Sequence, residues 1–311
     1  MLSRRNIRVK VMQILYSLNR NPEATLADLQ RQFQTNIDSS YELFLLNTLY
    51  LAQVAAYAEK DLEKRKSKHL PSADDKQFNA KLFNNNLMQS FVNDSNIAKS
   101  WEALKLIDRV DQDNLRTYYA EFAKKEEYKA YISNPNTTDA DHKQILLMLY
   151  KSLISNEMFN EVMDDYYWSW VDDKSLVVGT IKKTIKALPG NPDFFEPDKP
   201  DVEATTDFGR ELLTSVVEND ADLLAIIEPT LKNWATDRVA IMDMILIKMA
   251  LSELTAFPTI PTKVTLNEFV EISKLYSTDK SKDFINGILD RLMRKLNKEG
   301  KIQKEGRGLK E

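Results

Sequence analysis

The chain has 311 residues, of which 43% are hydrophobic and 29% charged, and its formal net charge is −4. This length suggests about two domains, the composition is that of an ordinary soluble protein, and the acidic balance argues against a protein that is basic all over. The absence of cysteine excludes disulfides, zinc–thiolate centres and a cysteine nucleophile, and two histidines leave little for a metal site, so we expect no metal and no cofactor.

Scarce glycine and helical periodicity predict an all-α fold, because hairpins and phosphate-binding loops both consume glycine. The first predicted helix has Ser3 as its N-cap and ends at Asn21-Pro22. Its buried stripe consists of Ile7, Val11, Ile14, Leu15 and Leu18. A second helix is expected to begin near Thr25, and a long helical run follows over residues 39–66.

The middle of the chain is also predicted to be helical, over 76–92, 96–109, 113–132, 140–158 and 160–171. Residues 175–181 look strand-like but stand alone, and we interpret them as helix or loop. Residues 189–204 hold four prolines and many acids, which is typical of a linker. We therefore expect an N-terminal helical domain over 1–200, enlarged by a helical insertion, and a C-terminal helical bundle over 201–311.

In that second domain, helices are predicted over 208–219, 221–227, 236–255 and 262–276. The last helix begins at Ser281, a suitable N-cap, and carries a broad apolar stripe. Within it, Asn286-Gly287 is expected to let helices approach closely. The basic tail after Gly300 is expected to be disordered.

Enzyme motifs are missing from the sequence: it has no Walker loop, dinucleotide-binding glycine run, GxSxG elbow or HExxH. Pairs of acids such as Asp164-Asp165 and Asp172-Asp173 are more typical of a surface than of a catalytic site. We therefore expect no catalytic residue. No run approaches the roughly 20 apolar residues of a membrane span, and no signal peptide is recognisable, so we expect a cytoplasmic protein without membrane contact.

Charge is distributed unevenly along the chain. Residues 1–10 carry four basic groups and no acid, and residues 291–311 carry eight basic groups and three acids, whereas residues 191–230 hold eleven acids and two bases. This pattern is compatible with a local anion-binding face on an acidic body. The alternative is that both termini are simply solvated.

Five segments together resemble the NusB family. They are RRNIRVKVMQILYS at the N-terminus, DFGRELLTSVVENDADLLAIIEPTLKNW from Asp207, RVAIMDMILIKMALSEL from Arg238, IPTKVTLNEFVEISKLY from Ile260 and SKDFINGIL from Ser281. The resemblance covers about residues 3–20 and 205–297 and does not extend over most of 21–200. Ser252, Ser277 and Lys280 depart from the residues usual in the family.

The resemblance implies two small helical bundles and a role in transcription antitermination without enzymatic activity. The implied partners are single-stranded boxA-type RNA of ribosomal RNA leaders, the ribosomal protein NusE and the RNA polymerase antitermination complex. The alternative that we weigh is a helical protein-interaction scaffold of the same fold with little or no RNA specificity.

The N-terminal helix carries the first group of candidate RNA-binding residues. On a helical wheel, Arg5, Arg8 and Tyr16 fall on one flank of the apolar stripe, and Arg4 lies next to Arg8. Arginines suit phosphates and base edges, and a tyrosine can stack on an unpaired base. Alternatively, Tyr16 packs in the core and the arginines are solvated.

The start of the last helix carries the second group: Lys280, Ser281, Lys282 and Phe284. Free backbone N–H groups at a helix start attract anions, and lysines add charge. Ordinary capping by Ser281 and core packing of Phe284 would explain the same residues. We expect the two helix starts to converge into one track for unpaired ribonucleotides.

The central helix of the C-terminal bundle offers two further candidates that the resemblance implies: Lys248 for RNA and Asp243 for the protein partner. Both could equally face solvent. Asn267-Glu268 matches a pair in the family and is interpreted as structural, capping or bridging helices.

Four aromatics, Tyr166, Tyr167, Trp168 and Trp170, cluster within the inserted region. Core packing is their more typical role, but exposed aromatics would indicate a partner site.

Overall fold

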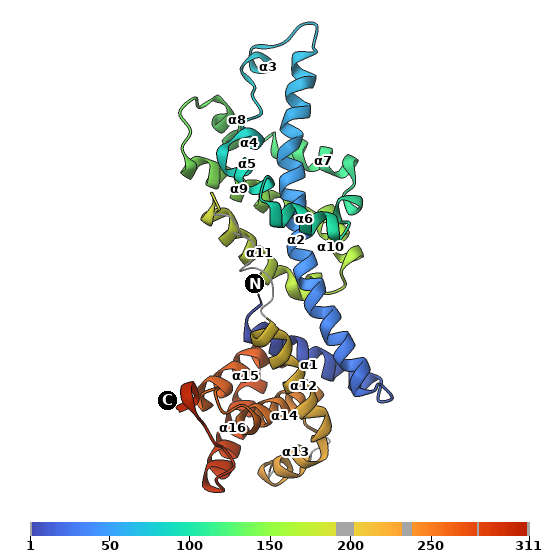
Figure 1. Ribbon diagram of the computed structural model, residues 1–311, viewed down its shortest axis with the longest axis vertical. Coiled ribbons are helices and arrows are strands. Elements are labelled where there is room, and N and C mark those ends of the chain that lie inside the picture. Colours follow the sequence, from blue (N-terminus) through green and yellow to red (C-terminus); the bar gives the residue numbers. More distant parts are fainter. Residues whose placement is uncertain (1, 191–201, 232–237, 279, 310–311) are drawn as a thin grey trace. The chain divides into compact units, whose positions relative to one another are not determined.

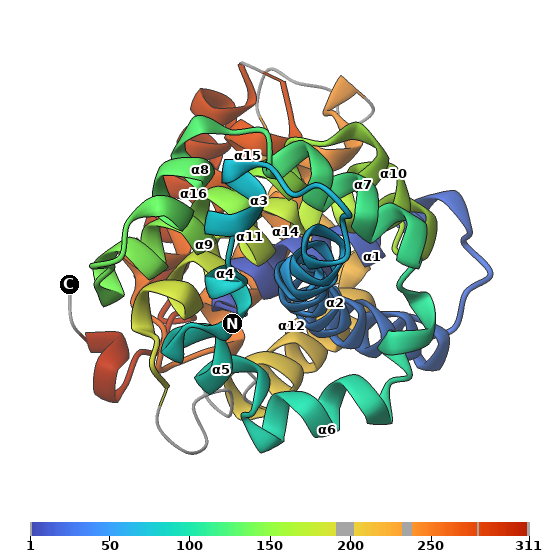
Figure 2. The same ribbon diagram turned by 90° about the horizontal axis from the view of Figure 1, so that it is seen from above.

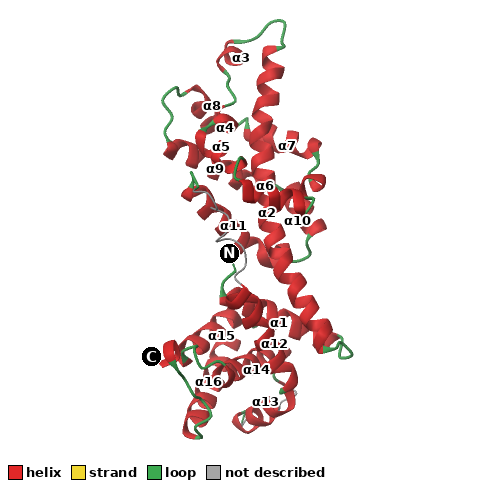
Figure 3. Ribbon diagram, in the orientation of Figure 1, coloured by secondary structure: helices red, strands yellow, loops and turns green. Residues whose placement is uncertain are grey.

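Every regular element of the computed structural model is helical, and residues 2–190, 202–231, 238–278 and 280–309, which the structure describes, contain no strand (Figure 3). The predicted all-α fold class is confirmed. The expected linker falls largely on residues 191–201, which lie outside the described residues. None of the helices in the described ranges is both long enough and apolar enough to cross a membrane.

The chain forms two compact units, and its N-terminal residues belong to the same unit as its C-terminal residues. One unit contains residues 38–199, and the other combines residues 2–37 with residues 200–311. We call them the insertion unit and the terminal unit. The first helix therefore packs with the C-terminal helices rather than with the rest of an N-terminal domain, because its apolar stripe shares one hydrophobic core with them.

The described part of the terminal unit consists of six α-helices besides the first turns of α2: α1 (Arg4–Arg20), α12 (Phe208–Glu218), α13 (Asp220–Ile227), α14 (Ile241–Ala256), α15 (Thr262–Tyr276) and α16 (Ser281–Lys298). Helix α14 is the centre of this unit and contacts α1, α12, α13, α15 and α16 (Figure 1). Its apolar residues are buried on several sides, as a helix surrounded by neighbours requires.

Local chemistry explains where α1 begins and ends. The Ser3 side chain accepts a hydrogen bond from the Asn6 backbone N–H, and the Asn6 side chain accepts one from the Ser3 N–H in return. This capping box satisfies two donors that would otherwise lack partners. The predicted cap and the predicted end at Asn21 are both confirmed.

Helix α16 begins differently from the prediction. Ser281 is its first helical residue rather than its cap, and its hydroxyl donates to Asp243 instead of accepting a backbone N–H. The expected close approach at Gly287 is also wrong, because a Cβ there would meet nothing within 4 Å. Close approach occurs at Gly209 of α12, where a Cβ would lie 2.0 Å from Phe33 Cζ.

The C-terminal tail is held against the bundle, contrary to the expected disorder. The Glu305 N–H donates to the Pro258 carbonyl at 3.0 Å, and Lys304 Nζ donates to the Phe257 carbonyl at 2.9 Å. Gly308 comes so close to Pro258 that a Cβ would lie 1.9 Å from the carbonyl oxygen. These backbone contacts leave no periodic signal in the sequence.

The insertion unit is built on α2 (Leu26–Lys66), which Figure 2 shows close to end-on. The two helices predicted on either side of residue 39 are thus one continuous helix. The other helices of the unit are α3 (Ala73–Gln77), α4 (Lys81–Asn84), α5 (Asn86–Val92), α6 (Ser95–Ala103), α7 (Gln112–Phe122), α8 (Glu126–Ser133), α9 (Asp139–Ile154), α10 (Glu157–Tyr166) and α11 (Trp170–Ala187). Residues 175–181 lie within α11.

Side chains of α2 hold this unit together by specific contacts. Tyr150 of α9 donates to the Asn47 side chain at 3.0 Å, and the Trp101 indole N–H donates to the Leu45 carbonyl at 3.1 Å. The rings of Tyr50 and Phe159 pack edge to face, with their centroids 5.4 Å apart. The Tyr150 hydroxyl and the Trp101 indole thus find partners in the interior of the unit, where an unpaired polar group is costly.

Candidate nucleic-acid interface

The three candidate arginines of α1 have different surroundings. Arg8 is buried, with 2% of its side chain exposed, and its Nε and one terminal nitrogen donate to the two carboxylate oxygens of Glu253 at 2.6 and 2.7 Å. Thr265 donates to the same carboxylate at 2.7 Å. Arg8 therefore joins α1 to α14, and it has no side-chain surface to offer an RNA.

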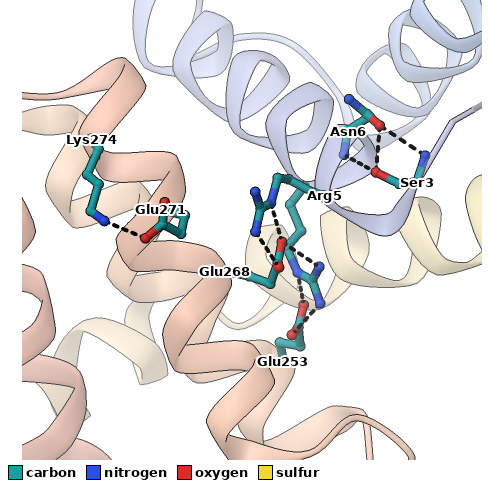
Figure 4. A network of polar contacts seen from close by, with 8 residues as sticks. Ser3, Arg5, Asn6, Glu253, Glu268, Glu271 and Lys274 are labelled. Atoms are coloured by element: carbon teal, nitrogen blue, oxygen red, sulfur yellow. Dashed lines mark hydrogen bonds and ion pairs between the residues drawn. The ribbon is translucent and has the colours of Figure 1, made fainter. Parts of the chain in front are cut away.

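Arg5 lies at the surface above this buried pair. Its Nε and one terminal nitrogen each donate to Glu268 of α15 at 2.7 Å (Figure 4). Hydrogen bonding and charge attraction by Arg5 hold the pKa of the Glu268 carboxyl below its usual range, and the same carboxylate raises the pKa of the guanidinium. About half of the Arg5 side chain, 48%, remains exposed. Glu268 bridges two helices, as its motif suggested.

Arg4 has no carboxylate partner like those of Arg5 and Arg8 among the residues that the structure describes. It is exposed, and its guanidinium carbon lies 5.2 Å from the ring centroid of Phe208. A cation over a ring face is attracted by the electron-rich face without being neutralised. Arg4 therefore keeps its positive charge available to a ligand.

These arginines line a surface hollow of about 670 Å³ in the terminal unit. Its other walls come from the start of α1 and from the loop and first turns of α15, namely Ser3, Thr259, Ile260, Pro261, Val264 and Glu268. Glu268 and Glu253 offset the charges of Arg5 and Arg8, so the described residues leave the hollow one excess positive charge, that of Arg4. The arrangement suits a single anionic group, such as one phosphate.

Tyr16 lies further along α1 and is partly buried. Its hydroxyl accepts a hydrogen bond from Arg20 at 3.0 Å, and the Arg20 guanidinium carbon lies 5.5 Å from its ring centroid. The tyrosine thus packs with a cation one turn away rather than with Arg5, which stands three turns earlier on the helix.

The second candidate group is split between surface and interior. Lys280 and Lys282 are exposed at the start of α16, and Phe284 is partly buried against the core. Ser281 is buried, and its hydroxyl donates to Asp243 Oδ2 at 2.8 Å, while Ser277 donates to Asp243 Oδ1. Asp243 is itself buried, so it fastens α16 to α14 and presents no surface to a partner.

Lys248 forms an ion pair with Asp220 and is largely covered, with 13% of its side chain exposed. It lies at one wall of an apolar groove of about 470 Å³ between α1, α12, α13 and α14. The groove is lined mainly by Leu15, Leu18, Val216, Leu224, Val239, Ile241, Met244 and Ile245.

The helices α1 and α16, whose first turns carry the two basic groups, are bonded to α14 at different positions along its axis. Arg8 holds α1 at Glu253, and Ser281 holds α16 at Asp243, ten residues earlier on the same helix. At 1.5 Å per residue this separation is about 15 Å. An RNA that touched both groups would therefore have to run along α14.

Sequence reasoning missed two residues that shape this surface. Phe208 supports Arg4, and its ring packs edge to face on Phe257 with centroids 5.3 Å apart. Glu253 neutralises Arg8. An acid in the last turn of a largely apolar helix was the available signal, because a buried carboxylate needs a cationic partner.

Comparison with known proteins finds relatives for part of the chain. The model of the NusB family matches residues 181–294. Among curated proteins, the transcription antitermination protein NusB of Chloroherpeton thalassium is 41% identical over 103 residues, which is 33% of this chain and 49% of the relative. Proteins of the same name from Salinibacter ruber and Listeria welshimeri are 38% and 42% identical over 34% and 27% of this chain, and over 66% and 65% of their own lengths.

The chain thus spans about half to two thirds of the length of these relatives. No solved structure matches it. The family match begins at residue 181, so it does not extend over most of the insertion unit. Residues 181–294 thus match the NusB family, and the rest of the chain lies outside the match of the family model.

Proposed function

We propose that the terminal unit binds single-stranded boxA-type RNA together with a NusE-type ribosomal protein, and that it acts in the bacterial cytoplasm as a non-enzymatic factor of the RNA polymerase antitermination complex. The observation that carries the RNA part of this proposal is Arg4, a charged guanidinium held over Phe208 beside a hollow at the start of α1.

Phosphate contact by Arg4 and Arg5 is the first element of the proposed mechanism. Arg4 brings an uncompensated charge, and Arg5 brings the terminal nitrogen that Glu268 does not use. Glu268 fixes the Arg5 guanidinium in one orientation, so less side-chain freedom is lost when a phosphate binds. Arg8 supports this surface from below through Glu253.

Lys280 and Lys282 are the second element, beside the N-terminus of α16, where backbone N–H groups favour an anion. Phe284 and Tyr16 are the rings available for stacking on unpaired bases, each partly exposed. Ser281 and Asp243 keep α16 in place rather than touching the ligand. Lys248 orients one wall of the apolar groove through Asp220, and that groove is the proposed seat of the protein partner.

The test is a titration of the full chain with a fluorescent boxA-type RNA and with a scrambled RNA of equal length, at several salt concentrations. The variant Arg4→Gln/Lys282→Gln removes one charge from each proposed contact. We expect affinity to fall and the salt dependence to weaken by about one counterion for each phosphate that the variant no longer neutralises. The matched control is Arg31→Gln, which removes an exposed arginine of α2 in the same unit.

Equal affinity for the two RNAs would contradict the proposed specificity. An unchanged affinity of the double variant would contradict the proposed contacts. The first of these results would favour a protein-interaction scaffold.

A further inference from the structure

The turn between α10 and α11 in the insertion unit exposes three large apolar side chains. The exposed fractions are 47% for Tyr166, 68% for Trp168 and 75% for Val171. The aromatic cluster noticed in the sequence is therefore divided, because Tyr167 and Trp170 are buried as expected. Exposed tryptophan is costly in water and marks interaction sites more often than bare surface.

The exposed side chains stand on a turn whose backbone is fixed from inside. The Trp170 N–H donates to the Tyr167 carbonyl at 2.9 Å, which closes the turn. The Trp170 indole donates to Asn160 at 3.2 Å, and the Tyr167 hydroxyl donates to Glu42 at 2.8 Å. Because Tyr167 and Trp170 are both buried and hydrogen-bonded, the backbone of the turn is already ordered. Binding at Trp168 therefore does not have to include the entropic cost of ordering the turn.

The chain segment around the turn is predominantly acidic, and Arg109 and Lys174 are the cations that contact its aromatic rings. Residues 152–173 contain six acids and neither lysine nor arginine, and Glu161, Asp164 and Asp165 are exposed on α10, the helix that leads into the turn. A guanidinium already lies on this surface, since the Arg109 carbon is 5.8 Å from the Tyr166 ring centroid. Acids next to exposed rings attract cations both by charge and by cation–π contact.

One polar group in the turn also lacks a partner within the described part of the chain. The Ser169 hydroxyl is buried, the residue is 3% exposed, and its oxygen makes no hydrogen bond. Because the chain's own atoms cover this oxygen, the Ser169 hydroxyl forms no part of the docking surface.

We propose that this turn, formed by Tyr166, Trp168 and Val171 and rimmed by Glu161, Asp164 and Asp165, docks an arginine-rich segment of a protein partner. A guanidinium group can stack on the aromatic rings and also form ion pairs with the carboxylates. An apolar or an acidic partner cannot form both kinds of contact. RNA is disfavoured because its phosphates would meet the exposed carboxylates of Glu161, Asp164 and Asp165. A second copy of the same surface is disfavoured for the same reason.

The test uses the full chain and an alternating arginine–serine dodecapeptide, with a glutamine–serine dodecapeptide as the uncharged match. Affinity is measured by calorimetry, and the Trp168 indole N–H signal is followed by NMR. We expect the arginine peptide to bind and to shift the Trp168 signal, while the signals of buried Trp101 and Trp170 stay in place.

Matched variants distinguish the contribution of the apolar contact to peptide affinity from that of the acidic charges. Trp168→Ser should weaken binding by about tenfold or more, whereas Leu70→Ser, which removes an exposed apolar side chain elsewhere in the unit, should not. Asp164→Asn/Asp165→Asn should weaken binding and flatten its salt dependence, whereas Glu126→Gln/Glu127→Gln should not.

Three results would overturn the proposal. One is equal affinity for the two peptides, and another is unchanged affinity of the Trp168 variant. The third is self-association or RNA binding that the Trp168 substitution abolishes, since either would give the surface a different occupant. The first two results do not bear on RNA binding by the terminal unit.

Discussion

Arg8 of α1 and Glu253 of α14 form a two-pronged ion pair whose side chains are 2% and 0% exposed. The rings of Phe208 and Phe269 flank the guanidinium, with centroids 5.4 and 5.8 Å from its carbon. The pair joins residues 245 positions apart in the sequence. Arg8, which the sequence analysis predicts to bind RNA, thus has a structural role: it holds α1 on the bundle.

The first prediction concerns this pair. Arg8→Met should lower the free energy of unfolding by about 3–5 kcal/mol, because it leaves the buried Glu253 carboxylate without its partner. The double variant Arg8→Met/Glu253→Leu should recover most of that loss, since no buried charge is left over. Urea denaturation of the wild type and of both single and double variants measures the coupling.

Arg4→Met is the control, because Arg4 is exposed and should change stability by no more than about 0.5 kcal/mol. If Arg8→Met proved as mild as this control, the buried pair would not exist in solution.

Hydrophobic periodicity in the sequence predicted the helices, whereas the roles of the candidate site residues depend on which of them are buried. The stripe from Ile7 to Leu18 indicated the right helix with the right cap, since a 3.6-residue pattern and a serine before it are local signals. The roles of Arg8 and Ser281 were not local. Each is decided by a carboxylate far away in the chain, Glu253 and Asp243, which no helical wheel of α1 or α16 can show.

The domain division illustrates the same limit. Proline content marked the change near residue 200, but nothing around residue 38 interrupts α2, which passes from one unit into the other as a single helix. Helical propensity is continuous around residue 38. The boundary between the two units at this point of α2 therefore depends only on contacts with the rest of the chain. The surface of the α10–α11 turn could not be predicted either, because aromatic residues at this density usually form a core.

The second prediction compares two glycines. Gly209→Ala should lower stability by about 1–3 kcal/mol, because the new Cβ would lie 2.0 Å from Phe33 Cζ and 2.8 Å from Ile7 Cγ2. Gly287→Ala should instead raise it by about 0.4–1 kcal/mol, because the site is helical and open and alanine loses less backbone freedom. Thermal unfolding of the two variants gives the signs, and a Gly209→Ala variant that gained stability would refute the packing described for α12.

The third prediction concerns Ser281. Ser281→Ala should lower the free energy of unfolding by about 1–3 kcal/mol, because a buried oxygen of Asp243 loses a donor. Lys282→Ala, one residue on and exposed, should leave stability unchanged and serves as the control. Urea denaturation distinguishes the two. A neutral Ser281→Ala variant that lost only RNA affinity would instead make Ser281 a direct contact.

The fourth prediction follows from the pKa of Glu268, which Arg5 lowers first by hydrogen bonding and then by charge attraction, with a further contribution from Arg8. Because the carboxyl is more acidic in the folded chain than in the unfolded chain, its contribution to stability is complete above the unfolded value of about 4.3. The contribution is lost as the pH falls from there through the folded-state pKa. Stability should therefore decline with acid over this window.

Arg5→Gln should raise the pKa of Glu268 toward that of a free glutamate, and the difference in stability between wild type and variant should shrink as the pH falls below about 4. Carboxyl-detected NMR titration follows Glu268 directly, and urea denaturation at a series of pH values follows its effect. Arg31→Gln, whose partner is Asp28, should leave the Glu268 titration unchanged. If Glu268 titrated alike in wild type and Arg5→Gln, the bridge between α1 and α15 would be absent in solution, and Arg5 would lack the orientation that the proposed phosphate contact requires.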